Sequence, residues 1–303
     1  PATSDVVLAF ANIDRDNDQS DNFKIPAALA TLLGLQDGRT YNVKNIAAYI
    51  AQDSTRRDQW IWPSDKTGAD LKSTGFTVFL KEVPTSDPEW STAPYEAQYL
   101  KVYDVTAPTA TPTTPDMPNA YNYEVGGQAT FDWDDVPADS EGVVPHYEVT
   151  VIINSGDPIT YITTVSEFTV SAVEGQQVSI SVRAVNPHDN SNKGPTSSQS
   201  PFVNLIASSG DEDGDGQSNS DEDKAGTNPL DNSSKFEISS QKMEENGDVT
   251  ITWSPVAGRT YAIQTSTTLA PESWSTVATG QTSGSWTDEN ATEDHQFYRV
   301  VVE

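Results

Sequence analysis

The twelve residues from Asp211 to Glu222, DEDGDGQSNSDE, place acidic side chains at alternate positions around a glycine. They match the calcium-loop template D-x-D-x-D-G-x5-E at every fixed position. Ca²⁺ takes about 6–8 oxygen ligands, and a tightly curled loop with alternating carboxylates can supply them. Gly216 permits the sharp turn. The predicted ligands are Asp211, Asp213, Asp215, the main-chain carbonyl of Gln217, Asn219 (directly or through water) and both oxygens of Glu222.

The alternative for this segment is a solvated acidic linker, although its unneutralised carboxylates would then repel one another. A regulatory pair of EF-hands is not expected. Ser218 stands where paired loops carry an apolar residue, and neither a partner loop nor a long entering helix is visible. With the GTNP sequence at 226–229, the segment resembles a thrombospondin type 3 or dockerin-like repeat. That resemblance implies a structural Ca²⁺ that stiffens a joint between two sandwiches.

A second acidic run contains Asp14, Asp16, Asp18 and Asp21. It has the alternation of a calcium loop but lacks both the turn-forming glycine and the terminal glutamate. Two interpretations remain open, a second metal site and a solvated surface loop.

Aromatic residues in the first hundred positions provide a candidate glycan-binding platform. Trp60 and Trp62 are two residues apart, so on a strand both rings face one side, and Trp90 and Tyr95 follow in a loop-like stretch. Exposed rings of this kind stack on the apolar faces of sugars. The alternative is that the tryptophans belong to the core, as most tryptophans do. The same two interpretations apply to Trp274 and Trp286, for which the core is favoured.

No constellation of catalytic residues is recognisable in the sequence. The three histidines, His146, His188 and His295, belong neither to an HExxH motif nor to a nucleophile elbow, and no glycine loop for phosphate is present. Carboxylate pairs carry no information in a chain with 45 acidic residues. We therefore predict no catalytic residue in this chain.

Composition narrows the classes of partner. The 303 residues include 45 Asp and Glu against 17 Lys and Arg, a formal net charge of −28. Such a chain repels phosphate, so nucleic acid and anionic membranes are excluded as expected partners. No apolar run is long enough for a membrane span. The absence of cysteine excludes disulfides.

Two breaks in composition, a Pro/Thr stretch and a Ser/Gly/Asp/Asn stretch, divide the chain. The predicted organisation is a β-domain with short helices at 1–105, a linker at 106–118, a sandwich at 119–206, a calcium-loop joint at 207–234 and a C-terminal sandwich at 235–303. In the first module we expect helices at 25–35 and 67–73 and strands at 40–46, 76–83 and 97–105.

The second and third modules share a sequence pattern. Each has a strand containing a tryptophan, ATFDWDDVP and VTITWSPV, then a β-rich segment, HYEVTVII and TYAIQTST, and later an alternating strand. Strands at this spacing predict antiparallel sandwiches, and the pattern resembles fibronectin type III domains. The predicted fold class is therefore mainly β, with tandem antiparallel sandwiches, short helices in the first module and a calcium-binding joint.

The first module resembles the β-domain that follows the catalytic barrel in some alpha-amylase-family glycoside hydrolases. The resemblance rests on FKIPAALATLLGL (23–35), TYNVKNIAAY (40–49) and YEAQYLKVYDV (95–105). Together with the order of modules, it implies a secreted bacterial region accessory to a polysaccharide-degrading enzyme, acting as spacer or anchor and as a candidate glycan binder. The barrel that would carry catalytic residues is absent, so none can be transferred.

Three functional hypotheses follow. The first is the calcium-stiffened accessory region, whose partners would be a polysaccharide or cell-surface glycan and an upstream catalytic domain. The second is a cell-surface adhesin or a subunit of an extracellular filament. The third is a fragment of a glycoside hydrolase whose catalytic domain lies elsewhere.

Overall fold

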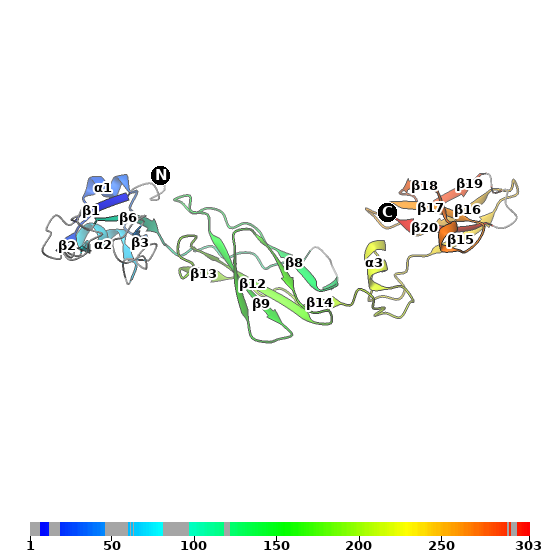
Figure 1. The fold of residues 1–303 in the computed structure, drawn as a ribbon, viewed down its shortest axis with the longest axis horizontal. Helices are drawn as coiled ribbons and strands as arrows, with labels where there is room; N and C mark the ends of the chain where they lie inside the picture. The colour runs from blue at the N-terminus through cyan, green and yellow to red at the C-terminus, as the bar shows by residue number, and fades with distance from the viewer. Residues whose placement is uncertain are drawn as a thin grey trace, which may run out of the picture. The chain divides into compact units, whose positions relative to one another are not determined.

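The computed structural model describes residues 7–11, 19–45, 60, 62, 64–80, 97–117, 122–289, 291 and 296–303. The fold is mainly β and consists of tandem β-sandwich modules with short helices, which confirms the predicted fold class (Figure 1). Close contacts divide the chain into two compact units. One comprises Pro1–Pro118, Thr130–Phe168 and Ser179–Pro201, and the other comprises Asn119–Ala129, Thr169–Val178 and Phe202–Glu303.

The first module is built on a four-stranded antiparallel sheet. In spatial order its strands are β1 (Val7–Ala11), β6 (Ala97–Asp104), β3 (Thr40–Asn45) and β4 (Lys66–Thr67). A separate antiparallel pair joins β2 (Gln19–Phe23) to β5 (Phe76–Leu80).

Both short helices expected in this module are present. Helix α1 (Ala27–Leu32) begins after Pro26 and is followed by Gly34, whose φ of 67° belongs to the left-handed region that favours glycine. Helix α2 (Gly68–Ser73) begins at Thr67, whose side chain accepts a hydrogen bond from the main-chain N–H of Asp70 at 3.0 Å. Such N-cap bonds satisfy donors that the first helical turn leaves unpaired.

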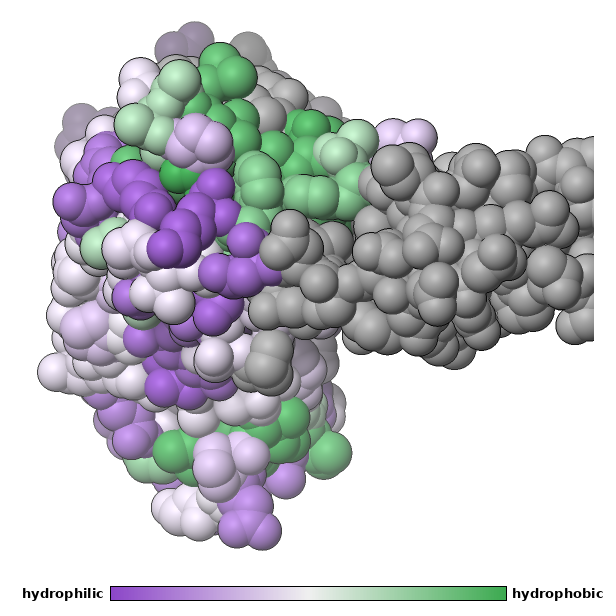
Figure 2. Space-filling model, turned by 90° about the vertical axis from the view of Figure 1, so that its left-hand side faces the viewer, coloured by the Kyte–Doolittle hydropathy of each residue, from purple (hydrophilic) through white to green (hydrophobic). Residues whose placement is uncertain are grey.

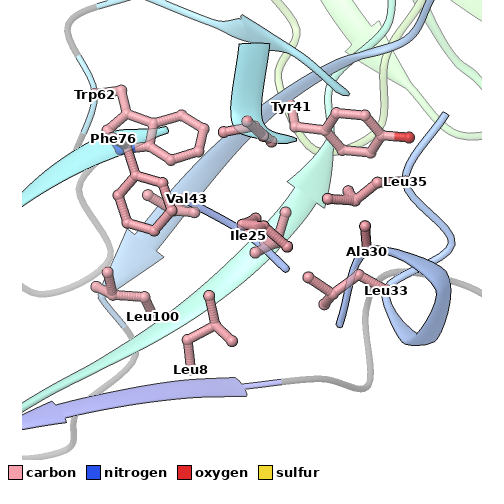
Figure 3. Packing of buried hydrophobic residues seen from close by; sticks show 12 residues of the cluster. Leu8, Ile25, Ala30, Leu33, Leu35, Tyr41, Val43, Trp62, Phe76 and Leu100 are labelled. Carbon is pink, nitrogen blue, oxygen red and sulfur yellow. The ribbon is translucent and has the colours of Figure 1, made fainter. Parts of the chain in front are cut away.

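The core of the first module lies on one face of the four-stranded sheet. Alternate residues such as Val43 and Leu100 point into it, together with residues of both helices (Figure 3). Val102 belongs to the same core, and all three residues are fully buried. Trp62 belongs to this core, because its side chain is only 5% exposed and its ring lies 4.9 Å from that of Phe76. The opposite face of the same sheet carries the residues between these positions.

The second module has the two-layer arrangement of a β-sandwich. Its larger sheet follows the order β10 (Ile159–Thr163), β9 (His146–Ile153), β12 (Gln177–Val185), β14 (Val203–Ile206) and β7 (Tyr123–Val125), and β13 (Lys193–Thr196) also pairs with β12. The smaller sheet pairs β11 (Glu167–Ser171) with β8 (Gln128–Asp132). The pairing of β14 with β7 is parallel.

The Pro/Thr stretch predicted as a linker follows an extended path along the second module. The main-chain N–H groups of Asp116 and Asp132 each donate to the other residue's carbonyl, at 2.9 and 3.1 Å. Pro112, Pro115 and Met117 are buried. Proline suits the edge of a sheet because it supplies apolar surface and has no main-chain N–H that would need a hydrogen-bond acceptor. The described part of this stretch is therefore packed against the sandwich.

The C-terminal module contains two three-stranded sheets. One has the order β15 (Ile238–Met243), β16 (Val249–Trp253) and β19 (Ser285–Asp288), and the other has the order β18 (Ser275–Gln281), β17 (Tyr261–Ser266) and β20 (Phe297–Val302). A single 3₁₀ turn, η4 (Pro271–Ser273), precedes β18.

The sequence pattern shared by the second and third modules corresponds to a shared packing unit. In the second module Trp133 packs edge-to-face on Tyr147, with ring centroids 5.3 Å apart. The hydroxyl of Tyr147 accepts a hydrogen bond from the main-chain N–H of Val136 at 2.8 Å. The tyrosine therefore joins the tryptophan strand to the turn that follows it.

The C-terminal module repeats this unit with different residues. The rings of Trp253 and Tyr261 lie 5.7 Å apart, and the hydroxyl of Tyr261 accepts from the main-chain N–H of Val256 at 2.7 Å. The tryptophan and valine are three positions apart in both modules. Both tryptophans are buried, as the sequence predicted.

This unit gives a matched pair of stability predictions. Tyr147→Phe leaves the N–H of buried Val136 without its acceptor, so we expect the free energy of unfolding to fall by about 1–2 kcal/mol. Tyr261→Phe should cost less, because Val256 is only partly buried and water can replace the hydroxyl. Denaturant unfolding measures both, with Tyr161→Phe as the control because that side chain is 44% exposed. Equal effects in all three variants would contradict the assigned role of the hydroxyl.

The surface is hydrophilic with separate apolar patches. Figure 2 shows one face on which hydrophilic residues form a band, with hydrophobic residues gathered above and below it. Within the described part of the chain, no helix has the length and apolar character needed to cross a membrane.

Candidate calcium-binding loop

The candidate loop runs directly into helix α3 (Asn219–Ala225). Ser218 caps this helix, since its hydroxyl accepts a hydrogen bond from the N–H of Asp221 at 3.2 Å. Gly226 ends it with a left-handed φ of 80°. The acidic residues Asp221 and Glu222 occupy the first turn, where the helix dipole stabilises negative charge. The cap therefore fixes the position of Glu222 relative to the loop.

Three aspartates converge within the loop. Asp211, Asp213 and Asp215 each offer a carboxylate oxygen, and these oxygens all lie within 4.8 Å of one another. The loop's own N–H groups hold the carboxylates in place. Asp211 accepts from the N–H groups of Gly214 and Gly216 at 2.9 and 3.0 Å. Both glycines have positive φ, 76° and 89°, which explains why this tight curl needs glycine.

Glu222 reaches the same cluster from the helix. Its side chain is fully buried, and its Oε2 atom has no hydrogen-bond partner among the described residues. The Oδ2 atoms of Asp213 and Asp215 are likewise buried without a hydrogen-bond partner there, and Lys235 Nζ lies 4.0 Å from that of Asp215. Buried polar atoms without a partner are costly and need an explanation. The carboxylate oxygens that lie within 4.8 Å of one another are those of Asp211, Asp213 and Asp215, and Glu222 interacts with these aspartates through its charge.

The pKa of Glu222 is raised by its burial and by the neighbouring carboxylates. Burial is the largest cause that raises its pKa, to about 7, and the charges of Asp213 and Asp215 raise it further. The hydroxyl of Thr227 opposes this shift only weakly, since it lies 3.5 Å from Oε1. Without a bound metal ion, Glu222 is therefore partly protonated near neutral pH.

Two of the predicted ligands have side chains that serve a different role. The Asn219 Nδ2 atom donates to the carbonyl of Ala207 at 2.6 Å and also to the carboxylate of Glu212, and its Oδ1 accepts from the N–H of Glu212 at 3.4 Å. Asn219 therefore ties the loop to the chain that leaves β14. The Gln217 side chain exchanges two hydrogen bonds with the main chain of Phe236, at 2.8 and 3.4 Å.

The loop and α3 are joined to both of their neighbours within the same compact unit. On one side, the N–H of Ser220 donates to the carbonyl of Ser208 at 3.0 Å, and the hydroxyl of Ser208 donates to Glu174 at 3.1 Å. On the other side, Arg259 donates to the carbonyl of Asp223 at 2.9 Å. Ala225 is buried in the core of the C-terminal module.

The packing of α3 also explains a second glycine requirement. A Cβ atom added at Gly226 would lie 2.8 Å from Cγ1 of Val256, which is closer than side chains pack. The helix end therefore fits tightly against the C-terminal sandwich. Sequence reasoning missed this contact, because the only signal, an alanine and a glycine after a polar helix, is common to many helix ends.

The predicted aromatic platform is only partly described. Trp62 lies in the core, and a ring that is 5% exposed has no free face for a sugar. Trp60 is partly buried, and Lys44 Nζ lies 4.2 Å from its ring centroid. Trp90 and Tyr95 lie outside the described residues.

The second acidic run lies mostly outside the described residues, and the two C-terminal tryptophans lie within them. Asp14, Asp16 and Asp18 lie outside the described residues, and Asp21 belongs to β2, with its side chain outside the description. In the C-terminal module, Trp286 packs against the core, and Arg299 lies over the Trp274 ring at 4.4 Å.

Comparisons with known proteins do not assign the chain to a family. No family model and no curated protein sequence match it. Among solved structures, the FN1–FN3 domains of chicken CNTN1 share 12% identity, with 97% of this chain and 90% of that chain covered and a TM-score of 0.32. A two-domain fibronectin type III segment of chicken tenascin shares 11% identity, with 63% and 98% covered and a TM-score of 0.25. We base the sandwich assignment on the strand order itself.

Proposed function

We propose that this chain is a calcium-stiffened spacer in a secreted multimodular protein. The observation that carries the proposal is the set of three buried oxygens without hydrogen-bond partners among the described residues, on Asp213, Asp215 and Glu222, together with the convergence of the Asp211, Asp213 and Asp215 carboxylates. Ca²⁺ prefers such hard anionic oxygens. Asp211, Asp213, Asp215 and Glu222 would hold the ion through carboxylates, and the main-chain carbonyl of Gln217 is the remaining proposed ligand. Asn219 would contribute by fixing the loop rather than by direct contact.

The position of the loop determines what the ion would do. The loop is hydrogen-bonded to Ala207 before it and to Phe236 after it. An ion that fixes the loop therefore also fixes these two attachment points. Without the ion, carboxylates that face one another across a few ångströms repel, and water screens this repulsion only partly. Calcium would accordingly act as a structural element of the joint.

The proposal extends to the context of the chain. Tandem sandwiches with a stiffened joint suit a spacer or anchor beside a polysaccharide-degrading enzyme, as the order of modules suggests. Support for this step comes from the sequence resemblance alone. Sequencing the gene upstream of the codon for Pro1 tests this step. We expect the upstream sequence to encode a catalytic barrel. An adjoining array of further sandwiches would favour the adhesin hypothesis instead.

Hydrogen exchange tests the stiffening directly. We expect Ca²⁺ to slow amide exchange in residues 207–234 and the chelator to restore fast exchange, because the apo loop loosens. Strands β9 and β12 serve as internal controls, since they lie in the core of the second module and should not respond. Unchanged exchange at 207–234 would contradict the proposed joint.

Calcium affinity should depend on pH. The proton held by Glu222 must leave before its carboxylate can bind the ion, so protons and Ca²⁺ compete. With a pKa of about 7 for Glu222, we expect the affinity to fall about tenfold for each pH unit below 7. Titration calorimetry at pH 6 and pH 8 measures this. An affinity that is equal at both values would show that Glu222 is not a ligand.

A further inference from the structure

The outer face of the four-stranded sheet in the first module carries a group of residues that the calcium proposal does not use. Val43 and Leu100 point into the core (Figure 3), and Val102 belongs to the same core, so the alternating residues between them point away from it. Lys44, Tyr99, Lys101 and Tyr103 therefore share this outer face, which we call the lysine–tyrosine face. Tyr99 is 47% exposed.

The two lysines of this face oppose each other directly. In the register of β3 and β6, Lys44 is the partner of Lys101. Like charges directly opposite on neighbouring strands destabilise a sheet. Among the ion pairs formed within the described part of the chain, none involves either lysine. A chain with 45 acidic residues could easily have supplied a carboxylate here.

Aromatic rings surround the lysines. The ammonium nitrogen of Lys44 lies 4.2 Å from the ring centroid of Trp60, and that of Lys101 lies 5.2 Å from the centroid of Tyr103. Cation–π contacts of this length hold the ammonium groups in place but leave their charge uncompensated. The face thus combines two fixed positive charges with apolar ring surface.

His188 adds a polar group at one end of the face. Its ring lies 5.0 Å from that of Tyr103. Burial, and next the charge of Lys101, lower the pKa of His188, so the two lysines carry the positive charge at neutral pH. The neutral imidazole can donate a hydrogen bond to a hydroxyl group or accept one from it.

We propose that the lysine–tyrosine face binds an anionic polysaccharide. Lys44 and Lys101 would together hold one carboxylate or sulfate group, which removes their mutual repulsion, while the exposed Tyr99 contacts the apolar face of a sugar ring. Carboxylated and sulfated sugars share this anionic oxygen chemistry. Nucleic acid is the less favoured ligand, because the chain's net charge of −28 repels a continuous phosphate backbone. The site uses none of the residues of the calcium loop and does not depend on it.

Binding of the full chain to four polymers in the presence of chelator tests this proposal. The probes are polygalacturonate (carboxylated), carrageenan (sulfated), dextran (neutral) and single-stranded DNA. We expect binding to one or both anionic glycans, weakened by salt, and none to dextran or DNA. The preferred glycan identifies the anionic group. Because calcium is absent, the result is independent of the proposed joint.

Variants then locate the site. The double variant Lys44→Gln, Lys101→Gln should lower the affinity at least about tenfold, since it removes two charge-assisted contacts. The matched control Lys24→Gln, Lys242→Gln removes the same charge from exposed positions elsewhere and should leave the affinity unchanged. Tyr99→Ala should weaken binding without altering its salt dependence. The melting temperature of each variant verifies that the module remains folded.

A charge-conserving variant covers the case in which the glutamine pair unfolds. Lys44→Arg, Lys101→Arg keeps both positive charges and should retain binding. The proposal is overturned if neither anionic glycan binds, or if dextran or DNA binds as tightly as the anionic glycans. It is also overturned if the control double variant loses as much affinity as the glutamine pair at 44 and 101, or if the arginine variant is folded but does not bind.

Discussion

Chelation of calcium should lower the melting temperature of the C-terminal part of the chain by about 10 °C or more. A ligand that binds only the folded state adds about 2.7 kcal/mol at a hundredfold excess over its dissociation constant. For a domain of this size, 1 kcal/mol corresponds to roughly 4–8 °C. The transition that responds should include the C-terminal sandwich, because α3 contributes Ala225 to its core. Differential scanning calorimetry with Ca²⁺ and with chelator measures the shift.

Single substitutions distinguish binding of Ca²⁺ in the loop from effects of Ca²⁺ elsewhere on the protein. Asp213→Ala should remove most of the calcium-induced shift, because it deletes a ligand and leaves the other carboxylates uncompensated. Asp223→Asn is the matched control, since this exposed carboxylate is adjacent to Glu222 on the same helix and is not a proposed ligand. A full shift in Asp213→Ala, or full replacement of Ca²⁺ by Mg²⁺ at equal concentration, would contradict the structural-calcium account.

Replacing Arg39 should have a comparable effect on the first compact unit. Its side chain is 12% exposed, and its guanidinium donates through Nε to the carboxylate of Asp104 and through Nη2 to that of Asp139, at 2.5 Å for the latter. The Asp104 side chain is only 6% exposed. Arg39→Met would leave this buried carboxylate without its cation, and breaking a buried pair in this way costs about 3–5 kcal/mol.

A double-mutant cycle and pH test this role of Arg39. Asp104→Asn added to Arg39→Met should recover part of the loss, because the uncompensated charge is removed. The contribution of Asp139 also depends on pH. Burial alone would raise its pKa, but the N–H of Val143 and the Arg39 guanidinium outweigh this and lower it. Stability from this carboxylate is therefore complete above about pH 4 and is lost as pH falls through its lowered pKa.

The control for Arg39 is Arg299→Ala. Arg299 is exposed and stacks on Trp274, so its removal should cost less than about 1 kcal/mol. Urea unfolding of both variants provides the comparison. A loss below about 1 kcal/mol for Arg39→Met would show that this ion pair is not structural.

Strands, helix ends and single loops could be predicted because the residues that determine them are close together in the sequence. Alternation and turn residues predicted the strands, Pro26 and Gly34 bracketed α1, and the repeated tryptophan and valine marked equivalent packing in two modules. The regular spacing of Asp211, Asp213 and Asp215 likewise predicted that their three carboxylates converge, because neighbouring residues of one tight loop need no distant contact to meet.

Features that depend on register or on distant contacts could not be predicted. Nothing in the sequence pairs Lys44 with Lys101, because strands 57 positions apart in the chain must first be aligned. The contact of Arg39 with Asp139 crosses 100 positions. Asn219 has the residue type and position of a ligand, yet its side chain is engaged by Ala207 and Glu212, a competition between hydrogen bonds that spacing does not reveal.

Calorimetric titration of the metal-free chain with Ca²⁺ tests the central claim most directly. We predict one high-affinity site per chain, lost in Asp213→Ala and in Glu222→Gln and retained in Asp223→Asn. The two sensitive variants remove carboxylates with buried oxygens that lack partners among the described residues, whereas the control removes an exposed one. Absence of binding by the unmodified chain, or the same binding in all three variants, would contradict the account.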